Sequence, residues 1–594
     1  MIKRKLSYMI VAGALIGMGA GPVAARVTDQ DILNDAATPG DVVTNGLGTK
    51  NQRYSPSTKI TPANIKDLVP AWTFQMGDEK QRGQQSQPVV HNGKMFVTGS
   101  YSRVFALDSK TGKKLWAYQH KLPEGILPCC DVINRGGVLY DNLFIYGTLD
   151  GLLVALDQDT GKVVWKATVG EYAEGVSISS APLIAKGMVI TGMAGGEFGV
   201  VGNVSAWDAK TGKNVWIRPT VEGHMGTLKG QPNGITGTLN ASWPGELWKQ
   251  GSSTPWMGCA YDPETNLAYC GTGNPGPWNS HLRPGDNLYS TSTVAIDVDT
   301  GKFSWAFQHT PNDAWDFDSM NTVMAFTNKK GQKLVAKADK NGFMYQLDAK
   351  TGKFVSGTPI CNSITWAKGL DPVTGRPIEN NNRPGDPVKS ADGKKGSSVF
   401  TAPSFLGCNN QQQFAYSGDT GLFYIPTVEW GMDIWNEPVS YKKGAAYLGA
   451  GFTIRPLAAK DINGVVSPKN LSGDYMGALR AFDPITNKIV WEIRDPAPLW
   501  GGALVTKGNL VFWGTPYGQL KAADAKTGKE VWAYQTGSGI IAPPISWEEG
   551  GEQYISIVSG WGGAVPLWGG EVAKLTAGIT QGGSVTVFKL HKSK

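Results

Sequence analysis

Two neighbouring cysteines, Cys129 and Cys130, have a spacing that calls for a chemical explanation. Consecutive Cα atoms lie about 3.8 Å apart, which is shorter than the usual disulfide separation of roughly 4.4 to 6.8 Å. A bond between these cysteines would close a small, strained ring that contributes little loop-closure stabilisation. Its purpose would therefore be its shape or its chemistry. Two unlinked buried thiols are the alternative.

A pair of carboxylates, Asp316 and Asp318, is the second candidate for chemistry. The two residues flank Phe317, and on an extended stretch their side chains would point the same way. Two carboxylates on one side suit a hard cation bound by oxygen ligands, and further negative ligands favour a more highly charged ion. A solvated loop is the alternative, but the apolar neighbours Trp315 and Met320 argue against it.

The first 25 residues have the pattern of a cleaved secretory signal. Basic residues at 3–5 precede an apolar run over 8–18 and small residues at 23–25. The mature protein would begin near Arg26 in an oxidising compartment, where disulfides persist. The apolar run is too short to span a bilayer, and no later segment has the roughly 20 apolar residues that a transmembrane helix needs.

Four further cysteines leave two pairings open. Cys259 and Cys270 bracket a turn and could face one another across a hairpin, while Cys361 and Cys408 could close a long insertion. Unpaired small hydrophobic residues are the alternative for each pair. The chain contains no Cys-x-x-Cys-His motif and therefore carries no c-type haem of its own.

A repeated unit supplies the elements that must position these residues. Each copy has an apolar strand, a turn of the form Asp-x-x-Thr-Gly-Lys whose glycine supplies a positive φ, and a returning strand that brings a tryptophan. The copies end at Trp116, Trp165, Trp216, Trp305, Trp491 and Trp532, with a version lacking tryptophan that ends at Val355. The closest copies are about 40 to 50 residues apart, the length of one four-stranded propeller blade.

We therefore expect an all-β fold, an eight-bladed β-propeller formed by residues 26–594 with long inserted loops. The segment around Trp72 is predicted to be another blade strand, and the repeated tryptophans are predicted to pack between blades. The abundance of Gly (77) and Trp (21) supports a repeat architecture of this kind. The net charge is +7, but the lysines are scattered through turns, so no nucleic-acid-binding face is indicated.

Several segments resemble, in order and nearly throughout the mature chain, the pyrroloquinoline quinone (PQQ) dependent alcohol dehydrogenases. They are PCCDVINRG, AGGEFG, QGSSTPWMGCAYDPETN, GTGNPGPWN and NDAWDFDSMN. That family is an eight-bladed propeller in which a vicinal disulfide lies against one face of the quinone and a tryptophan against the other. The resemblance implies a Cys129–Cys130 disulfide and assigns the tryptophan to Trp256. Both surfaces are apolar and polarisable, which suits a flat quinone.

The resemblance assigns further cofactor contacts. Arg135 matches the arginine that pairs with a cofactor carboxylate, and Ser179 falls where the family has a hydroxyl side chain. Gly195 and Gly196 would let the backbone approach the cofactor closely. Gln85 stands where some relatives place a polar cofactor contact.

The resemblance also implies a metal ion in the plane of the quinone. Glu197 matches the family's glutamate ligand, Asn274 its amide ligand, and Asp316 completes the usual protein set. Calcium enzymes of the family tend to have a small neutral residue at the position of Asp318, whereas lanthanide-dependent members have a second aspartate. We therefore expect a trivalent lanthanide, whose charge three carboxylates would balance. Calcium is the alternative.

One position departs from many relatives, because Lys340 stands where they have an arginine that hydrogen-bonds the quinone oxygens. A lysine still donates to those oxygens but lacks the planar fork. The implied mechanism is metal-assisted alcohol oxidation, with the ion as a Lewis acid on the quinone carbonyl. Asp316 would remove the hydroxyl proton, and Lys340 would stabilise charge developing on the quinone oxygen.

The segments VEWGMDIWNEPVSYKKGAAYLGAGFTIRP and VSGWGGAVPLWGGEVAK bring the resemblance closest to the ethanol dehydrogenase branch. The expected reaction is oxidation of primary alcohols such as ethanol to aldehydes in the periplasm. A soluble cytochrome c is the implied electron acceptor, and relatives of this branch suggest a homodimer. The alternative from another class is a non-catalytic propeller scaffold, which requires neither the cysteine pair nor the ligand set.

Overall fold

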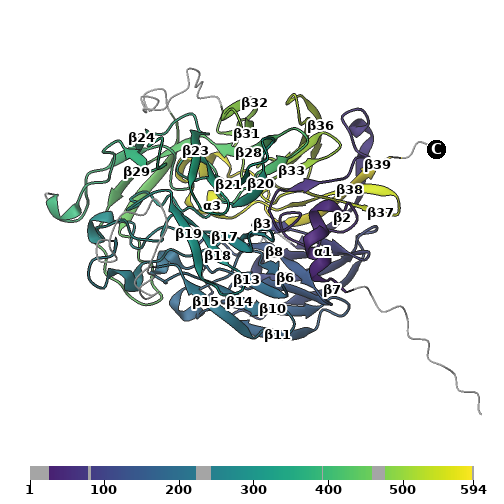
Figure 1. The fold of residues 1–594 in the computed structure, drawn as a ribbon, viewed down its shortest axis with the longest axis horizontal. Helices are drawn as coiled ribbons and strands as arrows, with labels where there is room; N and C mark the ends of the chain where they lie inside the picture. The colour runs from purple at the N-terminus through teal and green to yellow at the C-terminus, as the bar shows by residue number, and fades with distance from the viewer. Residues whose placement is uncertain are drawn as a thin grey trace, which may run out of the picture.

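The computed structural model describes residues 26–77, 82–126, 128–221, 242–390, 392–457 and 475–591. Residues 1–25, which carry the predicted signal, lie outside the described part of the chain. Strands dominate the described residues, and most of them pair in antiparallel sheets (Figure 1). The prediction of an all-β fold is confirmed. Within the ranges above, no helix is long and apolar enough to cross a membrane.

Sheets of four or five strands follow one another along the chain. The first three contain β4 (Val89–His91), β5 (Lys94–Gly99), β6 (Arg103–Asp108) and β7 (Lys114–Gln119); β3 (Gln84–Gln87), β8 (Asn134–Tyr140), β9 (Leu143–Gly147), β10 (Leu152–Asp157) and β11 (Val163–Thr168); and β12 (Leu183–Ala185), β13 (Met188–Thr191), β14 (Asn203–Asp208) and β15 (Asn214–Pro219). The next two contain β16 (Ala260–Asp262), β17 (Leu267–Gly271), β18 (Ser292–Asp297) and β19 (Phe303–Gln308); and β20 (Met324–Thr327), β21 (Lys333–Ala338), β22 (Phe343–Asp348) and β23 (Phe354–Pro359).

The remaining large sheets come from the C-terminal third and from two N-terminal strands. They contain β27 (Ala415–Ser417), β28 (Leu422–Val428), β31 (Gly477–Asp483) and β32 (Lys488–Asp495); β1 (Tyr54–Ser55), β33 (Ala503–Thr506), β34 (Leu510–Gly514), β35 (Gln519–Asp524) and β36 (Glu530–Gln535); and β2 (Leu68–Gly77), β37 (Ile545–Glu549), β38 (Glu552–Ser559) and β39 (Gly583–Leu590). Because β2 pairs antiparallel with β39, the two ends of the chain meet in one sheet, where purple and yellow strands lie side by side in Figure 1.

Smaller elements occupy the connections. The long insertion contains a hairpin of β24 (Ala367–Leu370) and β25 (Pro377–Glu379), and also β26 (Val399–Thr401). A three-stranded sheet joins β26 to β29 (Trp430–Asn436) and β30 (Ala450–Pro456), which lie in the connection between β28 and β31. Short helices include α1 (Asp29–Asn34), α3 (Ala564–Trp568) and α4 (Gly570–Leu575). The 3₁₀ turns include η1 (Asp35–Ala37), η2 (Ile65–Asp67), η3 (Ser100–Ser102), η4 (Tyr172–Glu174), η5 (Gly196–Phe198), η7 (Leu247–Gln250), η8 (Ser280–Leu282) and η9 (Pro387–Lys389).

The repeated Asp-x-x-Thr-Gly-Lys turn is stabilised by its own first residue. In the turn between β6 and β7, the Asp108 carboxylate accepts from the backbone N–H of Thr111 at 2.8 Å and from its hydroxyl at 2.7 Å. The N–H of Gly112 donates to the Asp108 carbonyl at 2.9 Å. Gly112 has a φ of 71°, in the left-handed region that glycine adopts at little cost. The predicted positive-φ glycine is therefore confirmed.

The repeated tryptophans pack against the glycine in the turn of the next sheet. A Cβ added to Gly161 would lie 2.6 Å from the ring of Trp116, and the indole N–H donates to the Gln158 carbonyl at 3.0 Å. The same ring-to-glycine contact joins Trp72 to Gly112, Trp165 to Gly212, Trp216 to Gly301, Trp305 to Gly352 and Trp491 to Gly528. The predicted packing of these tryptophans between neighbouring sheets is confirmed.

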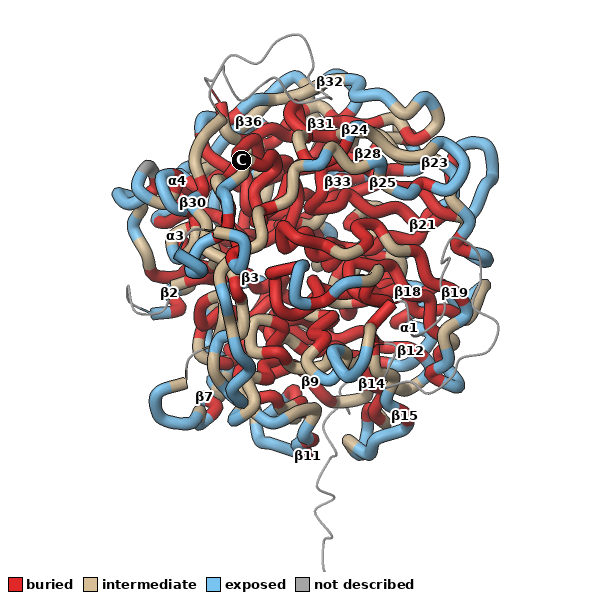
Figure 2. The backbone as a smooth tube through the Cα atoms, turned by 90° about the vertical axis from the view of Figure 1, so that its left-hand side faces the viewer, coloured by how far each residue is buried: buried red, intermediate tan, exposed pale blue. Residues whose placement is uncertain are grey.

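An N-terminal segment connects sheets that are far apart in the sequence. Arg53 is fully buried; its Nε donates to the carbonyl of Ala503 at 2.8 Å and its Nη2 to the carbonyl of Pro544 at 2.9 Å. Its Nη1 donates to Gln87 at 2.6 Å. Buried residues fill the interior, and exposed residues lie mainly in the outer turns (Figure 2). Arg53 therefore joins β3, β33 and the residue before β37 in the interior.

Candidate active site and metal centre

The segment between β19 and β20 supplies two buried carboxylates that converge on one lysine. The Nζ atom of Lys340 donates to Asp318 Oδ2 at 2.7 Å, to Asp316 Oδ2 at 3.3 Å and to the Asp316 carbonyl at 2.9 Å. The two carboxylates share one side, as predicted. The reason differs from the prediction, because Asp316 is not extended but has a left-handed φ of 60°.

Asn274 follows β17 and is linked directly to the second aspartate. Its backbone N–H donates to Asp318 Oδ1 at 2.5 Å, and its Nδ2 donates to the Pro275 carbonyl at 3.3 Å. The neighbouring pair Thr272 and Ser319 forms a β-bridge between the same two segments. The amide oxygen of Asn274 is therefore held beside the Asp-x-Asp segment by backbone pairing.

Glu197 lies in η5, and two glycines before it control how closely its segment can approach its neighbours. Gly195 has a φ of 132°, and a Cβ there would lie 2.8 Å from a backbone carbonyl oxygen. A Cβ on Gly196 would lie 3.4 Å from Asn274 Oδ1. The absence of a side chain at Gly196 lets the Glu197 segment lie against Asn274, and its absence at Gly195 lets the backbone approach the carbonyl of Gly175.

Burial disfavours the ionised forms of two carboxylates in this cluster. Burial raises the pKa of Glu197 to about 7, and repulsion from Asp318 adds to the shift. Burial also raises the pKa of Asp316 well above its usual range, and Lys340 offsets only part of that effect. Burial lowers the pKa of Lys340, but attraction to Asp316 and Asp318 outweighs it and raises that pKa. A multivalent cation among these carboxylates would stabilise their ionised forms.

The donor set fits such a cation. Asp316 Oδ1 is buried and has no hydrogen-bond partner among the described residues, so its lone pairs are available to a ligand. Each oxygen of Asp318 accepts one hydrogen bond and retains a further lone pair. Carboxylate and amide oxygens are the ligands that hard cations prefer. The structure thus brings together Glu197, Asn274, Asp316 and Asp318, whose role as ligands stays a prediction.

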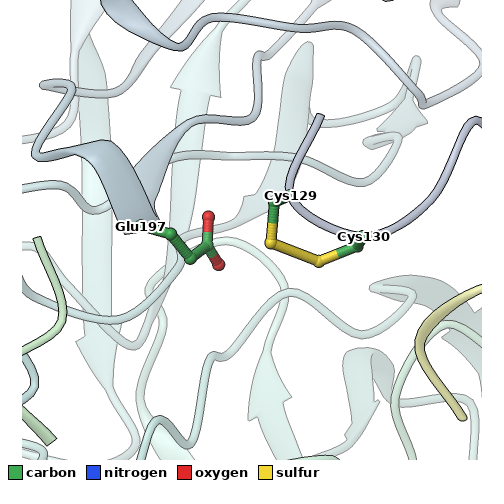
Figure 3. Close-up of side chains that lie close together, drawn as sticks. All are labelled: Cys129, Cys130 and Glu197. Carbon is green, nitrogen blue, oxygen red and sulfur yellow. A yellow bond between two sulfur atoms is a disulfide. The ribbon is translucent and has the colours of Figure 1, made fainter. Parts of the chain in front are cut away.

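The vicinal cysteines border this cluster. Cys129 and Cys130 form a disulfide, and the carboxylate of Glu197 points towards it (Figure 3). The two Sγ atoms and a carboxylate oxygen of Glu197 lie within 4.8 Å of one another. Because both sulfurs are bonded to each other, neither is a thiolate available to bind a metal. The half-buried disulfide therefore lies beside Glu197 without belonging to the donor set.

Arg135, Ser179 and Trp256 form a second group of predicted cofactor contacts. Arg135 Nη1 donates to Ser179 Oγ at 2.7 Å, and the guanidinium lies over the Trp256 ring at 5.2 Å from its centroid. Its Nε is buried without a hydrogen-bond partner among the described residues. Burial lowers the pKa of Arg135 to about 9, and the described carboxylates form no ion pair with it. A buried guanidinium of this kind fits the carboxylate of an acidic ligand.

Gln85 on β3 is placed near the residue that follows the vicinal disulfide. Its Nε2 would lie 2.8 Å from a Cβ on Gly563, and the N–H of Gly563 donates to Asp131 Oδ2 at 2.9 Å. Gln85 Oε1 is buried and has no hydrogen-bond partner in the part of the chain that is described. Gln85, the predicted cofactor contact, therefore has an unpaired acceptor oxygen near the Cys129–Cys130 turn.

The remaining cysteines are paired, so the alternative of unbonded thiols is wrong for both pairs. Cys259 is bonded to Cys270 across the β16–β17 hairpin, and Cys361 is bonded to Cys408 at the foot of the long insertion. The N–H of Cys408 donates to the Lys340 carbonyl at 3.1 Å. The second disulfide therefore anchors the insertion directly against the residue that contacts both aspartates.

Two serines that hold the ligand-bearing segments together were not predicted from the sequence. The Ser252 hydroxyl donates to the Gly196 carbonyl at 2.7 Å, and the Ser253 N–H donates to the Asn274 carbonyl at 2.9 Å. Both serines have left-handed backbones, with φ values of 56° and 58°. They stand just before Trp256, so a polar pair next to a predicted cofactor contact was the available signal.

The chain is similar to known proteins along nearly its whole length. Residues 44–361 and 475–555 match a family model described as "PQQ: Glucose/ethanol/alcohol dehydrogenase, beta-propeller domain". The chain is 56% identical to the quinoprotein alcohol dehydrogenase PedH of Pseudomonas putida, over 99% of this chain and 96% of the relative. It is 47% identical to a quinoprotein ethanol dehydrogenase of Pseudomonas aeruginosa, over 99% and 97%. A solved structure, a europium-containing methanol dehydrogenase, matches with a TM-score of 0.85 at 34% identity, covering 94% of this chain and 100% of that one.

Proposed function

Because the chain belongs to the PQQ-dependent (quinoprotein) alcohol dehydrogenases, we propose that it oxidises primary alcohols such as ethanol to aldehydes with PQQ and a lanthanide(III) ion. Its class of activity follows from the family, and so does its PQQ β-propeller domain. The non-catalytic scaffold alternative is set aside because the relatives named above are alcohol dehydrogenases along their whole length.

The architecture that we propose is a closed ring of eight blades formed by residues 26–594, after removal of a signal at 1–25. Support comes from the large sheets of the described residues, each of which carries a Trp-containing or equivalent outer strand. Trp72 on β2 packs on Gly112 in the turn of the β4–β7 sheet, so the sheet that joins both chain ends also contacts the first sheet. This contact is the one that a closed ring requires.

The observation that carries the metal assignment is the meeting of Asp318 with Asn274 and Asp316. Its Oδ1 accepts from the backbone of Asn274, and its Oδ2 accepts from Lys340 next to Asp316. Three carboxylates and one ammonium leave about two negative charges, which favours a trivalent over a divalent ion. The europium named for the similar methanol dehydrogenase agrees with this choice. Calcium remains the second candidate for the same donors.

We assign the cofactor to the space bordered by the Cys129–Cys130 disulfide, Trp256 and Arg135. Arg135 would bind an acidic group of PQQ, since its guanidinium is buried beside Ser179 without a carboxylate partner among the described residues. The disulfide and the indole would cover the faces of the quinone. When bound, PQQ supplies a two-electron acceptor and the metal ion supplies a Lewis acid.

The residues of the chain then have separate tasks. Asp316 Oδ1 accepts the hydroxyl proton of the alcohol, because it is the carboxylate oxygen that no described donor reaches. Lys340 orients this carboxylate, because its Nζ atom donates to Asp316 Oδ2 at 3.3 Å and to the backbone carbonyl of Asp316 at 2.9 Å. Burial raises the pKa of Asp316, so a neighbouring cation is needed to keep the base ionised at neutral pH.

The substrate, the partner and the location follow the family resemblance. Ethanol is supported by the quinoprotein ethanol dehydrogenase that shares 47% identity with this chain. A soluble cytochrome c would accept the electrons, because the sequence has no haem-attachment motif. Export to the periplasm agrees with cysteines paired in disulfides among the described residues. We also propose a homodimer, on the resemblance alone.

The test is dye-linked ethanol oxidation by the metal-stripped, full-length chain reconstituted with PQQ. One sample receives calcium(II) and another receives lanthanum(III) or cerium(III). We expect activity only with the lanthanide. Activity with calcium alone would overturn the metal assignment while leaving the quinoprotein class intact, and activity with neither ion would overturn the proposed reaction.

A further inference from the structure

A buried arginine joins the two segments that carry three of the proposed metal ligands. Asn274 lies in the segment after β17, and Asp316 and Asp318 lie in the segment after β19. Arg283 follows η8 between them and is only 1% exposed. It belongs to neither the donor set nor the predicted cofactor contacts.

The guanidinium of Arg283 spans the gap between the two segments. Its Nε donates to the carbonyl of Pro277 at 2.5 Å, and its Nη2 donates to the carbonyl of Trp278 at 3.2 Å, three and four residues after Asn274. The same Nη2 donates to the carbonyl of Asp313, three residues before Asp316. The planar fork of arginine can make these bonds together, which a lysine cannot.

Asp313 continues the connection into the Asp-x-Asp segment. Its carboxylate is 1% exposed and accepts from the N–H of Trp315 at 2.9 Å and from the N–H of Phe317 at 2.7 Å. These amides bracket Asp316, whose left-handed φ of 60° is an uncommon conformation for a residue other than glycine. Two hydrogen bonds to one side chain therefore fix the backbone on both sides of Asp316.

We propose that Asp313 and Arg283 are positioning residues that hold Asn274 at a fixed distance from Asp316 and Asp318 and thereby set the affinity of the metal site. Asp313 fixes the backbone conformation of one ligand segment, and Arg283 fixes that segment relative to the other. Neither residue touches the ion or the reacting atoms. The inference rests on the proposed function, because it takes these three residues as metal ligands.

Rigid hydrogen-bond partners of metal ligands are a general determinant of affinity. An Asp313→Asn change keeps the side-chain size but places an NH₂ group opposite one of the two amides. An Arg283→Lys change keeps the positive charge but loses bonds between the segments. Both variants should loosen the ligand set without removing a ligand.

The experiment titrates the metal-stripped, full-length chain, loaded with PQQ, with lanthanum(III) in competition with a chelator, and separately with calcium(II). Asp495→Asn is the matched control. Asp495 is also buried and accepts a backbone N–H two residues ahead, from Ala497 at 2.9 Å, but it lies on β32 in a sheet that supplies none of the ligands. Melting temperature is measured in parallel for every variant.

We expect Asp313→Asn and Arg283→Lys to weaken lanthanum(III) binding about tenfold to a hundredfold, with activity partly restored at saturating metal. Asp495→Asn should leave the lanthanum(III) affinity unchanged. Unchanged affinity in both site variants would overturn the proposal, and so would failure of both to fold, which would make their role purely structural. A wild-type chain that binds only calcium(II) would overturn the lanthanide assignment instead, and the calcium titration would then test the positioning role.

Discussion

The protein has a frame, formed by its four- and five-stranded sheets, and loops that carry the proposed metal ligands. Different kinds of contact stabilise the two. In the frame one neutral contact recurs, an indole packed on a turn glycine with its N–H on a carbonyl of the same turn, as for Trp116 and Gly161. In the loops each contact occurs once, and three carboxylates are grouped with one lysine. Asp316, Ser252 and Ser253 in these loops also have left-handed backbones.

The difference shows how the molecule accommodates an unfavourable site. Buried charges and left-handed non-glycine residues each cost free energy, and the loops contain several of both. The frame offsets this cost because its stabilising contact is repeated along the chain, and because disulfides such as Cys361–Cys408 anchor the loops to it. Changes in the loops should therefore alter activity more than stability, and changes in the frame should do the reverse.

The largest effect should come from removing the base in the loops. Asp316→Asn keeps the size of the side chain but cannot accept the hydroxyl proton, so kcat for ethanol should fall by about 10²- to 10⁴-fold. Because burial raises the pKa of this carboxyl, the melting temperature of the variant should be unchanged or higher. A loss of activity that only parallels a loss of folded protein would contradict the separation between site and frame.

The next largest effect should be on the stability of the frame. It compares two turn glycines, of which only one packs against a tryptophan. Gly212 and Gly331 both have left-handed φ values, 69° and 77°. A Cβ on Gly212 would lie 2.6 Å from the Trp165 ring, whereas nothing lies within 4 Å of a Cβ on Gly331. Gly331→Ala should cost only the backbone penalty of about 1–2 kcal/mol. Gly212→Ala should cost about 3 kcal/mol, because crowding against the indole is added.

Urea denaturation of the two glycine variants measures this difference directly. Ethanol oxidation by each folded variant should match that of the unmodified chain, since neither glycine lies in the ligand-bearing loops. Equal unfolding free energies for the two variants would show that the tryptophan contact contributes nothing to the frame.

A smaller effect should distinguish lanthanum(III) from calcium(II) at the proposed metal site. Asp318→Ser removes one negative charge and leaves Glu197, Asn274 and Asp316 in place. Lanthanum(III) affinity should fall at least tenfold, because a trivalent ion loses more by the loss of a charged ligand than a divalent one. Calcium(II) affinity should change less, and calcium-supported ethanol oxidation should appear or increase. Equal losses for both ions would mean that Asp318 does not select the metal.

The frame was predictable from the sequence because its stabilising contact is a motif. Trp116 and Gly161 belong to copies of one repeat, so their packing between sheets followed from the pattern. The ligand set followed from resemblance, since single residues such as Asn274 have no repeat to reveal them. The backbone of Asp316 was predicted wrongly as extended, because its φ of 60° depends on hydrogen bonds made by Asp313.

The cysteine pairings show the same limit over longer distances. Cys361 and Cys408 are 47 residues apart, and only the path of the insertion brings them together beside Lys340. The bonds of Arg283 likewise join segments that no local pattern connects. Sequence therefore predicts contacts that repeat or lie close along the chain, while contacts between loops require the folded frame.

The last effect concerns how the stability of the metal-free protein depends on pH. Burial and Asp318 raise the pKa of Glu197 to about 7, above its value of roughly 4.3 in an unfolded chain. Between these values the folded, metal-free protein binds more protons than the unfolded chain, so its stability should fall as pH rises from about 4.5 to 7 and then level off. Glu197→Gln removes the titrating group, and its melting temperature should fall less over that range. Parallel pH curves for the metal-stripped chain and the variant would contradict the assignment.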